Sequence, residues 1–245
     1  MKHLDFSGKR CLVIGGSSGI GNGIAHEFRA QGAAVHVTGT RPGAADYAGS
    51  DGSDLTGLGY TRLDVTLPET IEPFAAAFGA VDVLVLCQGI ALYKRQEFTR
   101  EGYDKVVAVN LDSVMYCALA FKPALLAARG SLIVISSVAA HIAMLGNPAY
   151  AASKAGAKHL TASLGESWAR EGIRVNGIAP GHVRTKLTAV TFDHPQRRAK
   201  ALEDVPLGRI GTPADIGHVA LFLASPLAAY VIGQTITVDG GLTLS

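Results

Sequence analysis

Residues 11–21 read Cys-Leu-Val-Ile-Gly-Gly-Ser-Ser-Gly-Ile-Gly, and this glycine-rich stretch decides the fold. It follows a short apolar run and precedes a segment of helical periodicity, which predicts a tight turn from a first strand into a first helix. Gly15 permits the turn, Gly19 lets backbone amides approach a pyrophosphate, and Gly21 allows the helix to pack closely on the strand. An anion would then meet the positive N-terminus of the helix. Such turns also occur in sheets that bind nothing.

Beyond this stretch, short β-branched runs alternate with longer segments of helical periodicity. The alternation predicts a doubly wound (Rossmann) α/β fold in one domain over residues 1–245, with a seven-stranded parallel sheet and helices on both faces. The predicted strands are Arg10–Ile14, Ala34–Thr38, Gly59–Leu63, Asp82–Leu86, Ser131–Ser136, Arg174–Ile178 and Gln234–Val238. The predicted helices are Gly19–Gln31, Pro68–Phe78, Arg100–Ala128, Pro148–Glu171 and Pro213–Ala224. Pro42–Leu58 is predicted to be a mobile loop with a weak helix, and Lys186–Asp204 a surface insertion that acts as a substrate lid.

The composition excludes several classes of protein. Apolar residues make up 48% of the 245, and 22 Lys and Arg against 20 Asp and Glu leave a formal net charge of +2. This is neither the composition of a disordered chain nor the basic surface that binds nucleic acid or an anionic membrane. Cys11, Cys87 and Cys117 are widely spaced, which predicts buried thiols rather than a disulfide framework or a metal site.

The apolar runs predict neither a signal sequence nor a membrane span. The N-terminal run Cys11–Ile14 is too short for a signal core. The longest nearly apolar stretch, Val219–Ile232, is interrupted by Ser225-Pro226 and is shorter than a span requires. We therefore expect a soluble, cytoplasmic protein with neither nucleic acid nor a membrane as partner.

The glycine spacing distinguishes this turn from related motifs. Gly-x-x-x-Gly-x-Gly differs from the Gly-x-Gly-x-x-Gly of the general dinucleotide fingerprint and from the P-loop. It resembles the short-chain dehydrogenases/reductases, in the single-domain branch that includes the 3-oxoacyl-carrier-protein reductases. That family usually has Thr where this chain has Ile14, a change that removes a hydroxyl from the turn. The resemblance covers essentially the whole chain and implies an NAD(P)-dependent oxidoreductase acting on CH–OH groups. It also implies a homotetramer built on Arg100–Ala128 and Pro148–Glu171.

A second motif, Tyr150-Ala-Ala-Ser-Lys154, carries acid and base chemistry. On a helix, residues four apart share one face, so the Lys154 ammonium can lie beside the Tyr150 phenol. A free phenol has a pKa of about 10, and lowering it by about 3 units requires roughly 4 kcal/mol of phenolate stabilisation. A nearby ammonium and an oxidised nicotinamide could supply it. By itself the motif equally describes a surface tyrosine packed on a lysine stem.

The resemblance adds two more catalytic positions. Ser137 stands thirteen residues before Tyr150, at the end of an apolar strand, and matches the family serine that orients the substrate oxygen. Asn110 matches the family asparagine that holds a water linking Lys154 to solvent as a proton relay. A purely structural asparagine is the alternative at that position. The neighbouring Ser136 is interpreted as a strand-end turn residue.

The family pattern also places the remaining cofactor contacts. Asp64-Val65 matches the acidic position that holds the adenine amino group, and Pro180-Gly181 followed by Thr185 matches the loop around the nicotinamide carboxamide. Where the family has Asn-Asn-Ala-Gly, this chain has Leu86-Cys87-Gln88-Gly89, which changes the local hydrogen bonding but keeps Gly89. The full predicted cofactor set is Gly15, Ser17, Ser18, Gly19, Ile20, Gly21, Thr40, Arg41, Asp64, Val65, Gly89, Tyr150, Lys154, Pro180, Gly181, Val183 and Thr185.

The end of the second strand bears on which dinucleotide binds. Gly39 stands where an acidic side chain would hold a ribose 2′-hydroxyl, while Thr40 can donate to a 2′-phosphate and Arg41 can pair with it. We therefore expect NADP(H) in preference to NAD(H). Two features leave NAD(H) open: Arg41 could be a solvated surface residue, and Ser17 stands where many NADP-binding relatives have a basic side chain.

The substrate is predicted only as a class. By resemblance the pocket residues are largely apolar, which indicates a small or medium hydrophobic ketone or secondary alcohol. They are Leu92, Ala139, His141, Met144, Leu145, His182, Leu187 and Phe192. A solvated loop histidine is the favoured interpretation of His182. Arg197, Arg198 and Lys200 in the lid could receive an acidic carrier protein, although a charge run is usually a solvated face.

Two rivals to a general carbonyl reductase stay open. One is a 3-oxoacyl-thioester reductase acting on a carrier- or CoA-linked substrate. The other is a non-catalytic NADP-binding sensor or scaffold on the same fold. The intact Ser137, Tyr150 and Lys154 set argues against the second.

Overall fold

All seven predicted strands form one parallel sheet in the computed structural model, which describes residues 2–244. The strands are β1 (Arg10–Ile14), β2 (Ala34–Gly39), β3 (Gly59–Arg62), β4 (Val83–Leu86), β5 (Ser131–Ile135), β6 (Arg174–Pro180) and β7 (Thr235–Val238). Their order is β3-β2-β1-β4-β5-β6-β7, and each neighbouring pair is parallel. Because the order reverses at β1, the connections after β1 and β4 diverge and leave a crevice at the carboxyl edge of the sheet.

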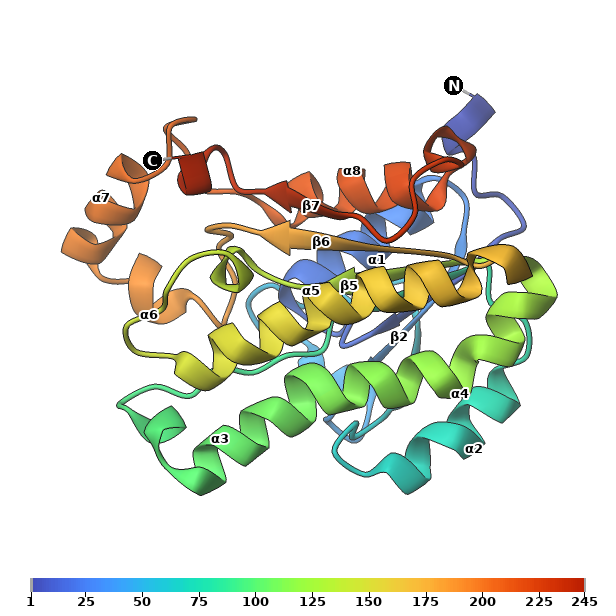
Figure 1. Cartoon of the computed structure of the whole chain (residues 1–245), viewed down its shortest axis with the longest axis horizontal. Coiled ribbons are helices and arrows are strands. Elements are labelled where there is room, and N and C mark those ends of the chain that lie inside the picture. Colours follow the sequence, from blue (N-terminus) through green and yellow to red (C-terminus); the bar gives the residue numbers. More distant parts are fainter. Residues whose placement is uncertain (1, 245) are drawn as a thin grey trace.

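Helices cover both faces of this sheet (Figure 1). They are α1 (Gly19–Ala30), α2 (Pro68–Phe78), α4 (Ser113–Ala128), α5 (Pro148–Trp168) and α8 (Pro213–Ala224). Helices α1 and α8 pack on one face, where Phe28 and Ile216 are buried. Helices α2, α4 and α5 cover the other face around Phe121. The strands are apolar on both sides because both sides are covered, and the doubly wound α/β fold is confirmed.

The predicted helix Arg100–Ala128 is not uniform. It comprises α3 (Arg100–Val107), a π-helical turn at Ala108–Asp112 and α4. Turns of this kind occur often at functional sites, and this one contains the buried Asn110. By length and composition alone the whole stretch could cross a membrane, which differs from the sequence-based expectation of no membrane span. In this fold it packs against α2 and α5.

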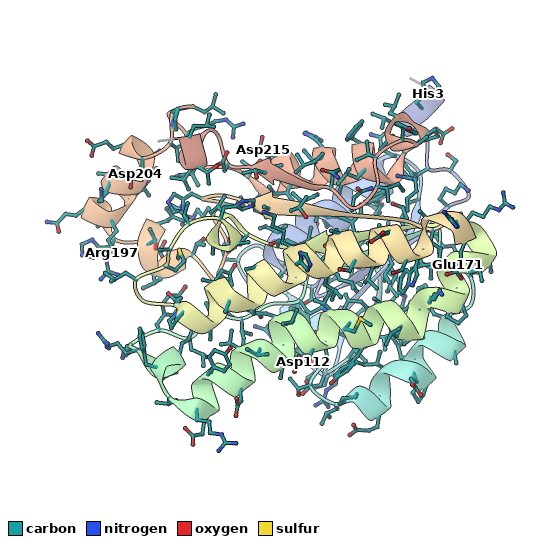
Figure 2. All side chains as sticks on the ribbon, viewed as in Figure 1. His3, Asp112, Glu171, Arg197, Asp204 and Asp215 are labelled. Atoms are coloured by element: carbon teal, nitrogen blue, oxygen red, sulfur yellow. The ribbon has the colours of Figure 1, made fainter. Side chains whose placement is uncertain are left out.

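The two predicted loops both contain short helices. Pro42–Leu58 includes the 3-10 turn η2 (Ala44–Tyr47), and Lys186–Asp204 includes α6 (Ala189–Phe192) and α7 (Pro195–Glu203). Figure 1 shows β6 and β7 pointing toward the end of the molecule where α6 and α7 project. Figure 2 shows Arg197 and Asp204 on this projecting segment, at the opposite end from Glu171. The segment therefore lies beside the edge at which parallel sheets bind ligands.

Candidate active site

The glycine turn after β1 is a close backbone cradle. Gly15 has φ +76°, and a Cβ there would lie 2.7 Å from the backbone N of Gln88. A Cβ at Gly21 would lie 2.4 Å from the Gly15 carbonyl oxygen. Only glycine fits either position, which is the arrangement that a dinucleotide pyrophosphate needs. The hydroxyl missing at Ile14 is replaced from β2, because the Thr38 Oγ1 accepts the Gly15 N–H at 3.1 Å.

The segment Pro42–Leu58 is docked on this turn. The Gly19 N–H donates to the Gly52 carbonyl at 2.8 Å. Asn22, in the first helix, donates to the Asp54 carbonyl at 2.7 Å and accepts from the Asp54 N–H at 3.1 Å. These contacts place the segment beside the predicted pyrophosphate site, an arrangement that its Gly- and Ser-rich sequence did not indicate.

The end of β2 brings Arg41 and Tyr47 together. The Arg41 guanidinium lies 4.6 Å from the Tyr47 ring centroid and donates to the Asp46 carbonyl and, at 2.9 Å, to Ser50 Oγ. Arg41 is thus held at a fixed place rather than free in solvent. A Cβ at Gly39 would lie 2.3 Å from the Tyr47 hydroxyl and 2.5 Å from Ser17 Oγ, so a side chain at position 39 requires both of these side chains to move.

Three of the four predicted catalytic side chains converge at the carboxyl ends of β4 and β5. Ser137 begins the 3-10 turn η5 (Val138–Ala140), where its Oγ accepts the Ala139 N–H at 3.1 Å, and its hydroxyl lies close enough to Tyr150 to lower the pKa of the phenol. Lys154 lies one helical turn after Tyr150 on α5, with its Nζ 5.8 Å from the Tyr150 ring centroid. That Nζ donates to the Ile135 carbonyl at 2.8 Å, and the Lys154 side chain is 4% exposed.

The pKa of Tyr150 corrects one expectation. Burial raises the pKa of its phenol, more than the hydrogen bond from Ser137 lowers it. Burial also shifts the pKa of Lys154, which it lowers from 10.5 to about 8. Both shifts favour the neutral form, as a site of low dielectric constant does. Burial is therefore the largest effect on the phenol pKa in this structure.

Asn110 is fully buried, and its side-chain amide forms hydrogen bonds with the backbone that follows β4. Its Oδ1 accepts the Ile90 N–H at 2.8 Å, and its Nδ2 donates to the Ile90 carbonyl at 2.9 Å and to Ser153 Oγ at 3.1 Å. A Cβ at Gly89 would lie 3.4 Å from Lys154 Nζ and 3.5 Å from Asn110 Oδ1. Asn110 thus fixes the chain next to Lys154, while the relay of a proton through it stays a prediction.

The predicted nicotinamide loop reaches the glycine turn. A Cβ at Gly19 would lie 3.3 Å from Thr185 Cβ, so the loop after β6 closes over the N-terminus of α1. Val183 is buried, and a Cβ at Gly181 would lie 2.5 Å from Asp239 Cβ. At the adenine end, Asp64 accepts from Thr66 N and Oγ1, and these bonds lower the pKa of its carboxyl.

Comparison with known proteins gives the family. A family profile described as enoyl-(acyl carrier protein) reductase matches residues 15–243. The chain is 38% identical to the 3-oxoacyl-[acyl-carrier-protein] reductase FabG of Escherichia coli (strain K12), over 98% of this chain and 99% of that protein. The chain belongs to the short-chain dehydrogenase/reductase family. It is also 37% identical to FabG of Chlamydia pneumoniae, over 96% of this chain and 97% of that protein.

Solved structures of other short-chain dehydrogenases/reductases share the fold. A gluconate 5-dehydrogenase from Burkholderia cenocepacia in complex with NADP and tartrate has a TM-score of 0.90 at 30% identity, covering 99% of this chain and 98% of that one. The NADP active-site complex of Pseudomonas aeruginosa RhlG also has a TM-score of 0.90 at 30% identity, covering 99% of both chains. This short-chain dehydrogenase/reductase is accordingly an NAD(P)-dependent oxidoreductase.

Its departure from the family pattern after β4 leaves a polar group unpaired. Gln88 Nε2 donates to Ser113 Oγ at 3.0 Å, whereas Gln88 Oε1 is buried without a hydrogen-bond partner among residues 2–244. Leu86 lies in the core. Cys87 is close enough to Lys154 for each to shift the other's pKa, and burial raises the pKa of its thiol to about 12.

The predicted substrate pocket of this short-chain dehydrogenase/reductase is only partly brought together. Phe192 is buried and packs edge-on against His182, with ring centroids 5.9 Å apart. His182 is half-buried, and burial lowers the pKa of its imidazole. Leu145 is 99% exposed, so no other part of the described chain packs over it.

Three residues near the site were missed. Tyr93 donates from its hydroxyl to the Leu187 carbonyl, so it joins the loop after β4 to the start of the lid segment. Asn147 donates to the Glu97 carboxylate, which also accepts the Tyr150 N–H. Each contact joins residues 50 or more positions apart, and none belongs to a local motif.

Proposed function

We propose that this oxidoreductase interconverts a small or medium, mostly apolar ketone and its secondary alcohol, with NADP(H) as the preferred cofactor. The observation that carries the proposal is the convergence of Ser137, Tyr150 and Lys154 beside a glycine cradle in which a Cβ would clash with the backbone. The cradle fits a dinucleotide, and the three side chains supply what a carbonyl reduction needs at its oxygen.

Each side chain has one task. Tyr150 donates its proton to the nascent alkoxide in reduction and removes one from the alcohol in oxidation. The Ser137 hydroxyl orients the substrate oxygen, Lys154 places a cation next to the phenol, and Asn110 holds the backbone beside Lys154. Hydride transfer is the chemistry that a bound nicotinamide supplies.

The predicted cofactor residues fall into four groups that would hold the dinucleotide. Those of the glycine turn surround the pyrophosphate, Asp64 and Val65 hold the adenine, and Gly89, Lys154 and the loop after β6 hold the nicotinamide side. Arg41 and Thr40 would receive a 2′-phosphate, and Gly39 brings no acidic side chain that would repel one. NADP in the structures of two relatives supports the same preference.

A 3-oxoacyl-thioester substrate is the second candidate. The FabG relatives, at 37% and 38% identity over nearly the whole chain, favour it. Arg197, Arg198 and Lys200 are exposed on the lid segment, where an acidic carrier protein could dock.

A substrate panel tests the proposal. Cyclohexanone, acetophenone, ethyl acetoacetate and acetoacetyl-CoA would each be offered with NADPH and with NADH. Faster turnover of the simple ketones with NADPH supports a general reductase, and faster turnover of the thioester selects the second candidate. Tight NADPH binding without turnover on any of the compounds would refute both.

We further propose a cytoplasmic homotetramer in which Lys186–Asp204 acts as the lid. Helix α4 carries an exposed apolar row of Tyr116, Leu119 and Leu126, each 43% or more exposed. A second subunit would cover that row, as the family resemblance implies for the long helices. The short helices α6 and α7 could move as a unit because they project from the sheet edge (Figure 1).

A further inference from the structure

Glu97 is a buried carboxylate next to the proposed site that has no assigned role. It lies in the 3-10 turn η3 (Gln96–Phe98) and is 2% exposed. No ion pair compensates its charge among residues 2–244. A carboxylate is rarely buried to this extent unless something nearby depends on it.

Hydrogen bonds satisfy Glu97 from both sides. Its Oε1 accepts the Leu92 N–H at 2.9 Å and the Asn147 Nδ2 at 2.8 Å, and its Oε2 accepts the Tyr150 N–H at 2.9 Å. All three partners are donors, which suits an ionised carboxylate that only accepts. Asn147 also donates to the Leu92 carbonyl at 2.8 Å, so it closes the same cluster.

This cluster joins the two pieces of chain that would face the substrate. Leu92 belongs to the loop after β4, which Asn110 fixes at Ile90 two residues earlier. Tyr150 lies in the first turn of α5, where backbone N–H groups have no partner within the helix. Glu97 therefore fixes the beginning of the helix that carries Tyr150 and Lys154 against the loop.

The backbone before Glu97 is strained in a way that these bonds can sustain. Lys94 and Arg95 have φ +55° and +61°, the left-handed conformation that side chains other than glycine rarely adopt. The two residues turn the chain back so that Glu97 reaches Leu92. Strain of this kind persists only where surrounding contacts over-determine it, and it clusters at functional sites.

Glu97 also contributes to the electrostatics at the Tyr150 phenol. The groups that face this phenol are Ser137 from η5, Tyr93 and Cys87 from the chain after β4, Glu97 from η3 and Lys154 from α5. Of these, Tyr93, Cys87 and Glu97 raise the pKa of Tyr150, as burial does, and Ser137 lowers it.

We propose that Glu97 is a positioning residue for the reaction: its carboxylate holds the first turn of α5 against the loop after β4 and keeps Tyr150 protonated and aimed at the substrate oxygen. The proposal rests on the proposed function, because it assigns Tyr150 as the acid. It adds a charged group, distant in sequence, on which that acid depends.

The test compares Glu97→Gln with Glu97→Asp and with the control Glu101→Gln, an exposed glutamate at the start of α3. Glutamine keeps the size but must turn its NH2 group toward at least one of the three donors. We measure NADPH binding by fluorescence and the steady-state oxidation of cyclohexanol as a function of pH. We also titrate the tyrosinate absorbance of each protein and subtract that of its Tyr150→Phe counterpart, which leaves the titration of Tyr150.

In Glu97→Gln we expect kcat to fall by about tenfold to a hundredfold, as for a displaced catalytic group. The NADPH Kd should stay within about twofold. Both the acidic limb of the oxidation profile and the tyrosinate midpoint of Tyr150 should move to lower pH, because a negative charge has been removed. Glu97→Asp, which keeps the charge, should leave both midpoints in place, and Glu101→Gln should match the wild type.

The proposal is overturned if Glu97→Gln leaves both pH midpoints, that of the oxidation profile and that of the tyrosinate titration, unchanged. This holds whether kcat stays the same or falls together with the melting temperature, because Glu97 then has only a structural role. If the wild type neither oxidises cyclohexanol nor reduces any compound of the panel, the proposed function fails instead. The absorbance titration then still decides whether Glu97 controls Tyr150. Should Glu97→Gln fail to fold, Asn147→Ala tests the same cluster while keeping the charge of the Glu97 carboxylate. A lower kcat with unchanged pH midpoints then supports the proposal, and an unchanged kcat contradicts it.

Discussion

At the scale of single residues, the site depends on two ionisable side chains of one helix, Tyr150 and Lys154, whose uncharged forms are favoured by burial. Burial raises the pKa of Tyr150 and lowers the pKa of Lys154 to about 8, so each is closer to its uncharged form than in water. A protonated phenol is ready to donate, which suits carbonyl reduction. Lys154 keeps its charge only below about pH 8.

Replacing Tyr150 by Phe should remove the proton donor and little else. We expect kcat for ketone reduction to fall by about a thousandfold, within the range for a lost general acid. The NADPH Kd and the melting temperature should be nearly unchanged, since the ring remains. Steady-state kinetics and fluorescence titration measure these quantities, with Tyr103→Phe on the exposed face of α3 as the matched control. Substantial residual turnover would contradict the assigned role.

The lowered pKa of Lys154 predicts a pH dependence. Because its folded pKa is about 8, the ammonium is lost as pH rises through that value, while Tyr150 stays protonated. The kcat/KM for reduction, which reports groups of the free enzyme, should therefore fall above about pH 8. Lys154→Arg keeps its charge at all these pH values and should lack this limb, although its maximum rate is lower. The same limb in both proteins would exclude Lys154 as its source.

At the scale of elements, the segment after β2 carries the choice of dinucleotide. Arg41 stacks on Tyr47 and bonds to Ser50, so the 3-10 turn η2 and the chain after it hold the guanidinium in place. A prearranged guanidinium loses little side-chain freedom when a phosphate binds.

Arg41→Ala should therefore weaken NADPH selectively. A charge-assisted hydrogen bond contributes about 1.5–3 kcal/mol, so we expect the KM for NADPH to rise by roughly tenfold to a hundredfold. The KM for NADH, which has no 2′-phosphate, should change by less than about twofold. Cofactor titrations at saturating ketone measure both, with exposed Arg100→Ala as control. An equal loss for both dinucleotides would mean that Arg41 stabilises the loop instead.

At the scale of the whole molecule, the proposed tetramer would cover the apolar row on α4. Leu119 is 49% exposed and belongs to the row that also contains Tyr116 and Leu126. Burying such a row against a second copy removes apolar surface from water.

Leu119→Glu should disrupt that contact. The wild type should elute as four chains of 25.4 kDa, and the variant as a smaller species, because a charge would be buried in the interface. Light scattering after gel filtration measures the mass. Leu67→Glu, at a similarly exposed leucine that precedes α2, should leave it unchanged. A monomeric wild type would refute the assembly.

Local patterns in the sequence predicted most of the fold. Strand and helix bounds agree with the structure to within a few residues, since apolar periodicity is read along the chain. At the start of α8, Thr212 and Asp215 form reciprocal cap bonds between residues three positions apart. The π turn around Asn110 was not predictable, because it changes hydrogen bonding within a helix without changing its apolar pattern.

The sequence by itself determined the glycine cradle and the juxtaposition of Tyr150 and Lys154. Both depend only on residues that are close together in the chain, within Gly15–Gly21 and within Tyr150–Lys154. The tertiary structure alone decided what surrounds them. Thr38 replaces the hydroxyl absent at Ile14, and Glu97 reaches the Tyr150 N–H across 53 positions of the chain. Such contacts depend on which loops meet at one edge of the sheet. Burial at that edge, which no local pattern measures, sets the protonation of the phenol and the ammonium.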